Sequence, residues 1–381
     1  MNIRRFWWVL AVPVFVALGW GKRSEAPVRE QRPALTLSAA IQGFDNQGFA
    51  RVNAPWSFRF PRDHGAHPNY RTESWQFAGH FQSDEGEDFA FQLAFFRLAM
   101  VPATAPIRSS AWGARGIFRG QLAVADFARR RFHTRERWSR DALGLSGAEP
   151  SRVWVEDWKM EAKTPSGGSH EFGLTARSDE VGLELNLRSV KPAITRSGDS
   201  DSATAFYAYA LSRLSGQGTL RIADRRYTVR GLAWLDRAWG LIPIPDGPVV
   251  WDRFLIQLDD GREIVAFRLR RRDGSGKPIA SLALIGQDAK LWSLDQSELS
   301  LKPQGYWKSP VDGAPYPVHW RLSLPAEGIH LDMVPFMEEQ EIDLSLRYWG
   351  GTVRVYGEAQ GRRVAGTGYA ELTGYAPRDT L

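Results

Sequence analysis

The sequence predicts an all-β protein built from two similar antiparallel domains, and three observations support this fold class. Apolar and polar residues alternate along several stretches, as side chains do on the two faces of a strand. A pattern of Gly, two residues, an aromatic residue, one residue and an acid occurs near the middle of the chain and again near its end. Aromatic residues make up 12% of the 381 residues, with 16 Trp, and such rings favour strands and cavities for apolar ligands.

The chain begins with a segment typical of an export signal. Two arginines precede an apolar run at residues 6–20, and Lys22 and Arg23 follow it. The run is shorter than the roughly 20 residues that cross a bilayer comfortably. We predict a signal peptide or membrane anchor at residues 1–23, a linker at residues 24–34, and a protein exported to the periplasm or cell envelope.

Two β-hairpins are predicted at corresponding places in the two halves. The first joins residues 73–81 to residues 89–97 through an Asp-Glu-Gly turn. The second joins residues 251–258 to residues 263–269 through an Asp-Asp-Gly turn. Each hairpin has a Trp near its start, Trp75 in the first and Trp251 in the second.

The repeated pattern closes each half of the chain. In the first half it contains Trp234 and Asp236, and in the second half it contains Tyr369 and Glu371. A strand places Trp234 and Asp236 on one face, and Trp239 follows three residues later. Two rings that flank one carboxyl in a dry slot would raise its pKa, which keeps a proton donor loaded near neutral pH. The alternative is a tryptophan-rich core strand that ends at a solvated Asp.

Similar lead-ins precede the two copies of the pattern. Gly, Thr, an apolar residue, Arg and an apolar residue occur at residues 218–222 and again at residues 351–355. Two copies of one hairpin, in the same order as the two Trp-led hairpins, indicate two copies of one domain. We therefore predict a first domain at residues 35–243 and a second at residues 244–381.

The remaining segments are mostly loops, with one ambiguous stretch. Residues 123–140 favour a basic amphipathic helix over part of their length, with a pair of strands as the alternative. Pro, Gly, Ser and Asp mark loops at residues 61–68, 101–110, 164–169 and 192–203, and the last is long enough for a mobile flap.

Composition excludes several classes of site. The chain has no Cys, which excludes disulfides, thiolate catalysis and iron–sulfur clusters. The net charge of +6 is carried largely by Arg interspersed with apolar residues. This indicates solvated strand faces, which could face an anionic membrane surface, rather than a nucleic-acid-binding surface. His64 and His67 have ligand-like spacing but lie in a Pro/Gly loop without evident carboxylate or thiol partners, so we predict no metal and no cofactor. The G-x-S-x-G, P-loop and H-E-x-x-H motifs are absent.

Several polar and aromatic residues on the predicted strands could line a ligand cavity. A polar side chain on an aromatic inner face must find a partner or a ligand, although each could equally be a satisfied core group. Arg97 could pair with a buried carboxylate. The candidate ligand-binding residues are Trp75, His80, Gln92, Arg97, Tyr207, Tyr209, Trp234, Trp239 and Tyr369.

The order of several separated motifs resembles the AttH/CrtC family, described as predicted secreted hydrolases and hydroxyneurosporene synthases, which are carotenoid hydratases. The resemblance covers nearly the whole chain after about residue 35. The motifs are F-Q-L-x-F-F-R at 91–97, the segment 207–214, G-x-x-W-x-D-x-x-W-G at 231–240, the W-D-x-F-x-x-Q-L-D-D-G-R-E stretch at 251–263, Y-P-x-x-W at 316–320, Gln340-Glu341, and G-Y-A-E-L-T-G-Y at 368–375.

The resemblance implies two lipocalin-like β-barrels packed together, export, and long apolar ligands that are often isoprenoid. It also implies an ABC transporter permease as a partner. The hydratase branch adds water to an isolated alkene, which needs an acid for the double bond, aromatic faces for the cation and one placed water. Asp236 is the first candidate acid and Glu371 the second. An ester or amide hydrolase would need a nucleophile or activated water with an oxyanion hole, and the sequence offers no convincing set.

The chain departs from the family pattern at two positions. The family's D-x-E-W has Ala238 in place of Glu, and the family's Y-W-E-G has Gly350 in place of Glu. Each change removes a carboxylate from a suspected site. Because like-charge pairing is one way to keep a carboxyl protonated, Asp236 would depend on desolvation alone.

Three functions are consistent with these features. The first is an exported lipocalin-like protein that binds an apolar lipid or isoprenoid, working with a transporter and associated with the membrane if the N-terminal segment is uncleaved. The second is a hydratase or hydrolase that acts on such a lipid through Asp236. The third is a structural module with filled barrels. An Asp236→Asn change separates the first two, because it should abolish chemistry while binding persists.

Overall fold

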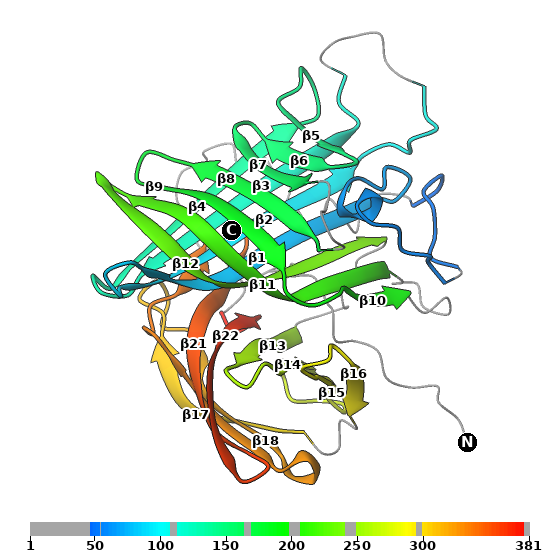
Figure 1. Ribbon diagram of the computed structural model, residues 1–381. Coiled ribbons are helices and arrows are strands. Elements are labelled where there is room, and N and C mark those ends of the chain that lie inside the picture. Colours follow the sequence, from blue (N-terminus) through cyan, green and yellow to red (C-terminus); the bar gives the residue numbers. More distant parts are fainter. Residues whose placement is uncertain are drawn as a thin grey trace, which may run out of the picture.

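The protein is all-β, as predicted (Figure 1). The computed structural model describes residues 46–53, 55–106, 113–163, 169–197, 206–240, 249–294 and 299–376, so the predicted signal or anchor and the linker lie outside the described residues. The described chain forms two antiparallel sheets and two short 3-10 helices, Arg62–His64 and Pro325–Glu327. No helix in these ranges has the length and apolar character needed to cross a membrane.

The first sheet curls into a near-barrel. Its strands follow the order β4-β3-β2-β1-β12-β11-β9-β8-β7-β6-β5, with β10 paired to β11. The strands are β1 (Thr72–Ser83), β2 (Asp88–Ala99), β3 (Gly116–Asp126), β4 (Arg131–Arg140), β5 (Ser146–Glu149), β6 (Arg152–Val155), β7 (Trp158–Lys163), β8 (Glu171–Arg177), β9 (Val181–Ser189), β10 (Ile194–Ser197), β11 (Phe206–Ile222) and β12 (Arg225–Gly240).

The second sheet forms a half-barrel. Its strands follow the order β16-β15-β14-β13-β22-β21-β19-β18-β17, with β20 paired to β21. The strands are β13 (Val249–Leu258), β14 (Glu263–Arg271), β15 (Ile279–Ile285), β16 (Leu291–Leu294), β17 (Ser300–Lys308), β18 (Pro315–Leu324), β19 (Ile329–Pro335), β20 (Glu341–Asp343), β21 (Arg347–Ala359) and β22 (Arg362–Thr373). The chain passes from one sheet to the other between β12 and β13.

Both predicted hairpins are confirmed as β1–β2 and β13–β14. The helix predicted over part of residues 123–140 is wrong, because β3 and β4 form a third hairpin there. Pairing with β3 gives the Arg-rich β4 a partner for its backbone and leaves its basic side chains at the edge of the sheet. The alternation of Arg with polar residues therefore reflects an edge strand rather than a helix face.

The register of the strands defines which residues of the repeat are equivalent. Gly231 pairs with Phe81 in the first sheet, and Gly366 pairs with Leu258 in the second. Counting from these pairs makes Gln76 the equivalent of Arg253. The two opening tryptophans are therefore not equivalent, because they are offset by one residue and a one-residue offset reverses the face.

The predicted lead-ins are also not equivalent. Gly218 pairs with Val229, whereas the glycine that pairs with the corresponding Val364 is Gly357 rather than Gly351. Gly218 and Gly357 share a positive φ and an approach to a neighbouring backbone carbonyl that a Cβ would block. Their equivalence therefore rests on backbone geometry, which the short sequence match did not capture.

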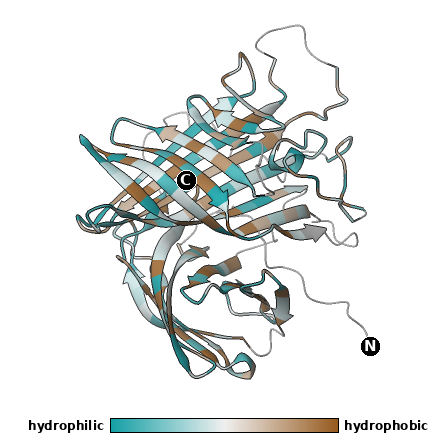
Figure 2. Ribbon diagram, viewed as in Figure 1, coloured by the Kyte–Doolittle hydropathy of each residue, from teal (hydrophilic) through white to brown (hydrophobic). Residues whose placement is uncertain are grey.

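Each sheet surrounds a packed apolar core. Trp75, Phe77 and Trp158 pack inside the near-barrel with Leu and Val residues of the surrounding strands, almost fully shielded from solvent. Trp320 and Trp349 lie in the corresponding core of the half-barrel. Hydrophobic and hydrophilic bands alternate along the strands in Figure 2, as expected when one face of each strand is buried. The described strands of the near-barrel therefore surround a packed apolar core.

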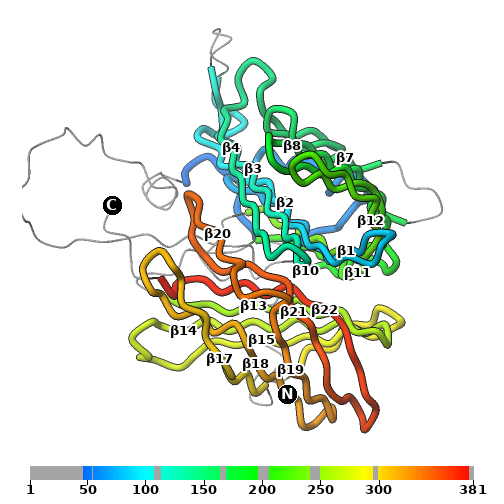
Figure 3. Tube along the Cα trace, turned by 90° about the vertical axis from the view of Figure 1, so that its left-hand side faces the viewer, coloured from blue at the N-terminus to red at the C-terminus, as the bar shows by residue number. Residues whose placement is uncertain are grey.

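A third apolar cluster joins the two sheets. Side chains on the outer face of β1 and β12 pack against the outer face of β13 and β22, and Figure 3 shows these strands facing one another. Glu263 of β14 adds a buried ion pair across the interface, with Lys191 Nζ at 2.8 Å and Arg213 Nε at 2.5 Å. Buried charged groups need partners of opposite charge, so these ion pairs fix how the two sheets are aligned, and the apolar contacts hold them together.

Candidate functional site

The two acids of the repeated pattern meet at one arginine between the sheets. Asp236 extends from β12, Glu371 from β22, and Arg253 of β13 lies between them. The Arg253 guanidinium forms an ion pair with Asp236, and its Nη1 lies 3.7 Å from Glu371 Oε2. Asp236 is 5% exposed and the other two side chains are fully buried. The structure thus brings together the two residues that the sequence proposed as alternative acids.

Each carboxyl also accepts a hydrogen bond from an indole. Trp234 Nε1 donates to Asp236 Oδ1 at 2.8 Å, and Trp251 Nε1 donates to Glu371 Oε1 at 3.1 Å. Trp234 and Asp236 can meet because they lie two residues apart on one face of β12. The predicted shared face of this pair is confirmed.

Gln76 of β1 completes the arrangement. Its Nε2 donates to Glu371 Oε2 at 3.4 Å, and its Oε1 accepts from Arg253 Nη1 at 3.3 Å. It therefore links the acid of one repeat to the arginine that binds the acid of the other. We define the polar layer as Gln76, Asp236, Arg253 and Glu371.

Burial dominates the electrostatics of the polar layer. It raises the pKa of Glu371, because desolvation disfavours the carboxylate, although Arg253, Gln76 and Trp251 oppose the rise. Burial also lowers the pKa of Arg253, against the attraction of Glu371. The layer contains two carboxyls and one guanidinium. The carboxyl that the arginine contacts less closely, Glu371, therefore retains its proton above the usual range of a glutamic acid.

A small pocket lies one step along the strands from the polar layer. Ala78, Trp234, Leu255 and Tyr369 line it, and each lies two residues from a member of the polar layer on the same strand. Two residues of a strand span roughly 7 Å, so the polar layer lies next to the pocket, although none of its four members lines it. The pocket has a volume of about 20 Å³, enough for roughly one water molecule.

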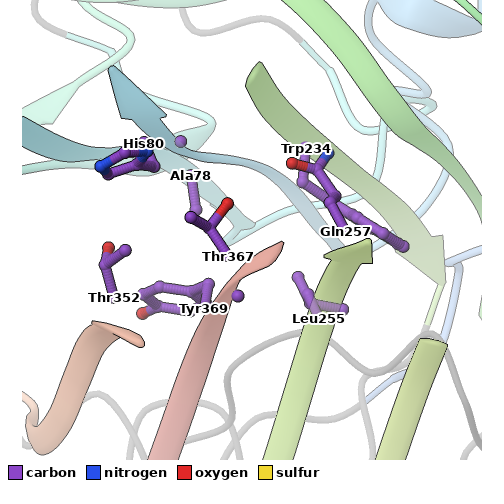
Figure 4. A pocket seen from close by; sticks show the side chains of 10 residues that line it. Ala78, His80, Trp234, Leu255, Gln257, Thr352, Thr367 and Tyr369 are labelled. Atoms are coloured by element: carbon purple, nitrogen blue, oxygen red, sulfur yellow. The ribbon is translucent and has the colours of Figure 1, made fainter. Parts of the chain in front are cut away.

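The rest of the pocket wall is more polar. His80, Gln257, Thr352 and Thr367 line it, from both sheets (Figure 4). His80 Nε2 lies 3.0 Å from Asp88 Oδ1, and burial lowers the pKa of this imidazole against the attraction of Asp88. The pocket therefore combines two aromatic rings with hydrogen-bonding groups, at the scale of a single water molecule.

Gln92, another candidate, lies outside the residues that line this pocket. Its Oε1 accepts from Tyr348 Oη at 3.2 Å and from Gln121 Nε2 at 3.2 Å. It contributes to the contact between the sheets.

The two departures from the family pattern lie next to the polar layer. Ala238 is buried in the apolar contact between the sheets. Gly350 pairs with Glu371 across β21 and β22. A Cβ at Gly350 would lie 2.7 Å from Tyr369 Oη and 2.7 Å from Tyr348 Cε2. Two tyrosines therefore occupy the space into which a side chain at position 350 would extend.

Trp239 does not flank Asp236 as the sequence suggested. Strand side chains alternate, so Trp234 and Asp236 face the half-barrel while Arg237 and Trp239 face the interior of the near-barrel. The three-residue spacing between Asp236 and Trp239 places them on opposite faces of β12.

The inward face of β12 builds a second polar group, which we define as the mouth cluster: Asp63, His67, Glu73, Arg97 and Arg237. Glu73 forms ion pairs with Arg237 and with Arg97 Nη2, the latter at 2.8 Å. His67 Nε2 lies 3.2 Å from Asp63 Oδ1, and His67 Nδ1 lies 3.3 Å from Glu73 Oε2. The predicted lack of carboxylate partners for His67 is therefore wrong, because the loop folds back onto β1. The predicted pairing of Arg97 with a buried carboxylate is confirmed.

Aromatic rings enclose the mouth cluster. The Arg237 guanidinium lies 3.9 Å from the centre of the Trp75 ring and 5.0 Å from that of Trp239. His67 stacks on Trp239 at 3.8 Å between ring centres. Burial alone would raise the pKa of Glu73, but Arg97 and Arg237 hold it well below its usual range. Glu73 is therefore held as a carboxylate inside the protein.

A chain of three side chains lies beside the mouth cluster. His64 Nδ1 is 2.6 Å from Tyr209 Oη, and His64 Nε2 is 3.0 Å from His170 Nδ1. Burial lowers the pKa of His64 to about 3 and raises that of Tyr209 above its usual range. Tyr207 lies nearby, with its ring 6.0 Å from that of Trp239. His64 and its two hydrogen-bond partners tie the segment that contains it to β11 and to the start of β8, at the mouth of the near-barrel.

Sequence reasoning missed Arg253, Gln76, Arg237 and Glu73. The three charged residues could have been found from the sequence, because each lies on a strand among residues that are typically buried. A buried charge requires an opposite charge nearby. Arg253 lies between Trp251 and Leu255 at period two, which is this kind of position. Among the described residues, no three His, Asp or Glu side chains form a group that could hold a metal ion.

Comparisons with known proteins agree with this architecture. The family model described as AttH-like matches residues 51–375. The crystal structure of a protein from Nitrosomonas europaea named as an AttH has 26% sequence identity and a TM-score of 0.73, covering 86% of this chain and 100% of that chain. Kievitone hydratase from Nectria haematococca has 13% identity and a TM-score of 0.65, covering 87% of this chain and 98% of that chain, which shows a common fold. A search of curated protein sequences finds no match.

Proposed function

Because the chain belongs to the AttH-like family, we propose that it binds a largely apolar, unsaturated small molecule between its two barrels and adds water to a carbon–carbon double bond. The observation that carries this proposal is the meeting of Asp236 and Glu371 at Arg253, beside a pocket lined by two aromatic rings. At about 20 Å³ this pocket has room for the reacting water, so the alkene would enter only where the two sheets move apart. One of the two carboxyls has a raised pKa, as a proton donor for an alkene requires. Kievitone hydratase shares the fold and carries a hydration reaction in its name.

The proposed reaction is a proton transfer followed by addition of water. The Glu371 carboxyl donates its proton to one alkene carbon, and the π electrons form the new C–H bond. The cation on the other carbon lies against the faces of Trp234 and Tyr369, which stabilise positive charge. A water oxygen then bonds to the cation and loses a proton to the Glu371 carboxylate, which restores the acid.

Arg253 and Asp236 position the acid in this mechanism. The ion pair between them orients the guanidinium, whose Nη1 lies between Gln76 and Glu371. The indole of Trp251 and the amide of Gln76 hold the Glu371 oxygens. Fixed partners of this kind keep a catalytic group in one orientation without reorganisation during the reaction. Asp236 is thus a positioning residue, and the acid is Glu371, the second candidate from the sequence.

Binding without chemistry is the second candidate function. Gly350 and Ala238 favour it, because both replace family acids and tyrosine side chains occupy the space beside Gly350. In this version the protein carries a lipid or isoprenoid for a transporter of the ABC type. Export to the periplasm or cell envelope belongs to both versions and rests on the apolar run and flanking charges at residues 1–23.

The two functions are separated by incubating the protein with kievitone and with neurosporene in ¹⁸O-labelled water. If the protein is a hydratase, wild type should form a product heavier than the alkene by one labelled water. Glu371→Gln should form none of this product but should still bind the alkene. Glu358→Gln, an exposed change on neighbouring β21, serves as the matched control and should keep activity. Retention of either alkene by wild type without labelled product would support binding alone. Neither retention nor product would contradict both proposals.

A further inference from the structure

One end of the near-barrel differs from the other in its exposed side chains. At this end β2 and β4 finish, β3 and β5 begin, and the segment at residues 46–71 covers the mouth (Figure 1, where that segment is blue). Its turns expose Met100 and Val101, each 38% exposed, and Leu143 and Leu145, at 53% and 49%. We define these four residues as the apolar rim.

The turns that carry the apolar rim are neighbours. Met100 N donates to Arg115 O at 2.8 Å, and Arg115 N donates to Asp141 Oδ1 at 2.7 Å. These contacts join the turn after β2 to the turn after β4. The four side chains therefore belong to one edge of the near-barrel rather than to separate places on its surface, and clustered exposed apolar groups mark interaction sites.

Arginines surround this edge. Arg51, Arg59 and Arg62 of the covering segment are exposed, as is Arg140 at the end of β4. The segment is tied to the same edge, because Ala66 N donates to Glu149 O at 3.2 Å. The carboxylate of Asp141, by contrast, accepts from two backbone N–H groups, those of Arg115 and Gly116. Glu156 and Asp157 are also exposed here, on the turn whose Glu156 N donates to Leu145 O at 2.7 Å, but both carboxylates pair with Arg137. With Glu149 also exposed, the charge near the apolar rim is mixed and positive overall.

The opposite end of the near-barrel has a different character. Its turns carry acids as well as arginines: Asp84 and Glu85 follow β1, and Asp179 and Glu180 follow β8. None of the large exposed apolar residues of the described chain lies on these two turns. Positive charge and exposed apolar side chains thus coincide at one end only.

We propose that the apolar rim and its arginines lie on an anionic lipid surface. Apolar side chains that enter the headgroup region, surrounded by cations that contact lipid phosphates, are the composition of a peripheral membrane contact. The chain also enters the near-barrel at this end, where Arg71 Nη1 donates to Asn46 Oδ1 at 2.7 Å. The 25 residues at positions 21–45 join this end to the apolar run at residues 6–20. A connection of that length would keep this end of the near-barrel within reach of a bilayer that held the run.

The absence of Cys from the chain allows a direct test on the full-length protein. An environment-sensitive fluorophore is attached to Leu145→Cys and, in a separate protein, to the matched control Val311→Cys. Val311 is 58% exposed and lies on the half-barrel. Both are reconstituted into phosphatidylcholine vesicles with or without phosphatidylglycerol, and with spin-labelled lipid as quencher. We expect lipid quenching and a blue shift for the label at position 145 in anionic vesicles, and neither for the label at position 311.

A charge variant tests the electrostatic part of the proposal. Arg51→Gln combined with Arg62→Gln, in the Leu145→Cys background, should require about 25-fold more anionic lipid for the same quenching, since one arginine near such a surface contributes about five-fold. The intrinsic tryptophan emission of each variant shows that it is folded. Equal quenching of the two labels, or no quenching of either, would overturn the proposal. A blue shift at position 145 in detergent without lipid would indicate a second protein copy there and would also overturn it.

Discussion

The two faces of β12 build two buried charge clusters from the same kinds of residue, with opposite outcomes. In the mouth cluster, Arg97 and Arg237 surround one glutamate, Glu73, whose pKa is held below its usual range. In the polar layer, one arginine lies between two carboxyls, and the pKa of Glu371 is raised. Both glutamates are fully buried. The ratio of arginines to carboxyls, rather than burial alone, therefore decides whether a glutamate holds a charge or a proton.

This difference assigns different roles to the two clusters. A glutamate between two arginines stabilises the covering segment of the near-barrel and has no proton to donate. A glutamate that shares one arginine with an aspartate binds its proton more tightly, because its pKa is raised. The variants below test the comparison, beginning with the largest expected effect.

Glu73→Gln should be strongly destabilising. It leaves Arg97 and Arg237 buried without their carboxylate, and loss of one partner from a buried pair costs about 3–5 kcal/mol. Chemical denaturation monitored by tryptophan fluorescence measures the free energy of unfolding. Asp332→Asn, which breaks the exposed pair with Arg321, is the control and should cost about 0–1 kcal/mol. Equal effects of the two changes would show that the mouth cluster contributes no more than a surface ion pair.

Stability should fall as the pH falls below about 6.5, in part because of His64. The pKa of this imidazole is about 3 in the folded protein and about 6.5 in an unfolded chain, so the unfolded state binds the proton more tightly between these values. The stabilisation is complete above pH 6.5 and decreases with acidification, by about 2 kcal/mol between pH 6.5 and 5. His64→Gln should remove this part of the pH dependence in denaturation curves. An unchanged slope would assign the acid sensitivity to other groups, such as His170.

Asp236→Asn should lower the pKa of Glu371. The change removes the competing carboxylate, so Arg253 then has Glu371 as its one acidic partner in the polar layer. Infrared pH-difference spectra of the variant should show the buried carboxyl ionising at lower pH than in wild type. Asp332→Asn again provides the control, with no expected shift. A rise of the Glu371 pKa in Asp236→Asn would mean that Asp236 mainly fixes the orientation of Arg253.

Glu371→Gln should have the smallest effect on folding. The pKa of this carboxyl is higher in the folded protein than in the unfolded chain, where it is about 4.3. The carboxyl therefore stabilises the folded state fully below pH 4.3, and this stabilisation is lost as the pH rises through the pKa of the folded state. A neutral amide resembles the protonated acid, so the free energy of unfolding at neutral pH should change by less than about 1 kcal/mol or increase slightly. Chemical denaturation of Glu371→Gln and Glu73→Gln under the same conditions measures both free energies of unfolding. A loss as large as that in Glu73→Gln would erase the distinction between the clusters.

The sequence predicted much of the fold because strand periodicity and turn chemistry are local signals. The two hairpins, the duplicated architecture and the shared face of Trp234 and Asp236 all follow from side chains that alternate every two residues. The same rule explains the errors. Trp239 is an odd number of residues from Asp236 and therefore lies on the opposite face of β12. Trp75 and Trp251 are offset by one in register, so they lie on opposite faces of their sheets and are not equivalent.

The candidate site was predicted less completely because it depends on contacts between distant segments. Asp236 and Glu371 were proposed separately, and no local pattern shows that they share Arg253. The carboxylate partners of His67 likewise come from the return of a loop onto β1. Such contacts are set by how the two sheets pack, which short motifs do not encode.

The protonation state of Glu371 tests the central claim most directly. Infrared pH-difference spectra of wild type minus Glu371→Gln isolate the carboxyl stretch of this one side chain. The account predicts a protonated carboxyl that persists above the pH at which exposed glutamic acids have ionised, near 4.3. A Glu371 that ionises at or below that pH would contradict it, because the polar layer would then hold two carboxylates and no acid for an alkene.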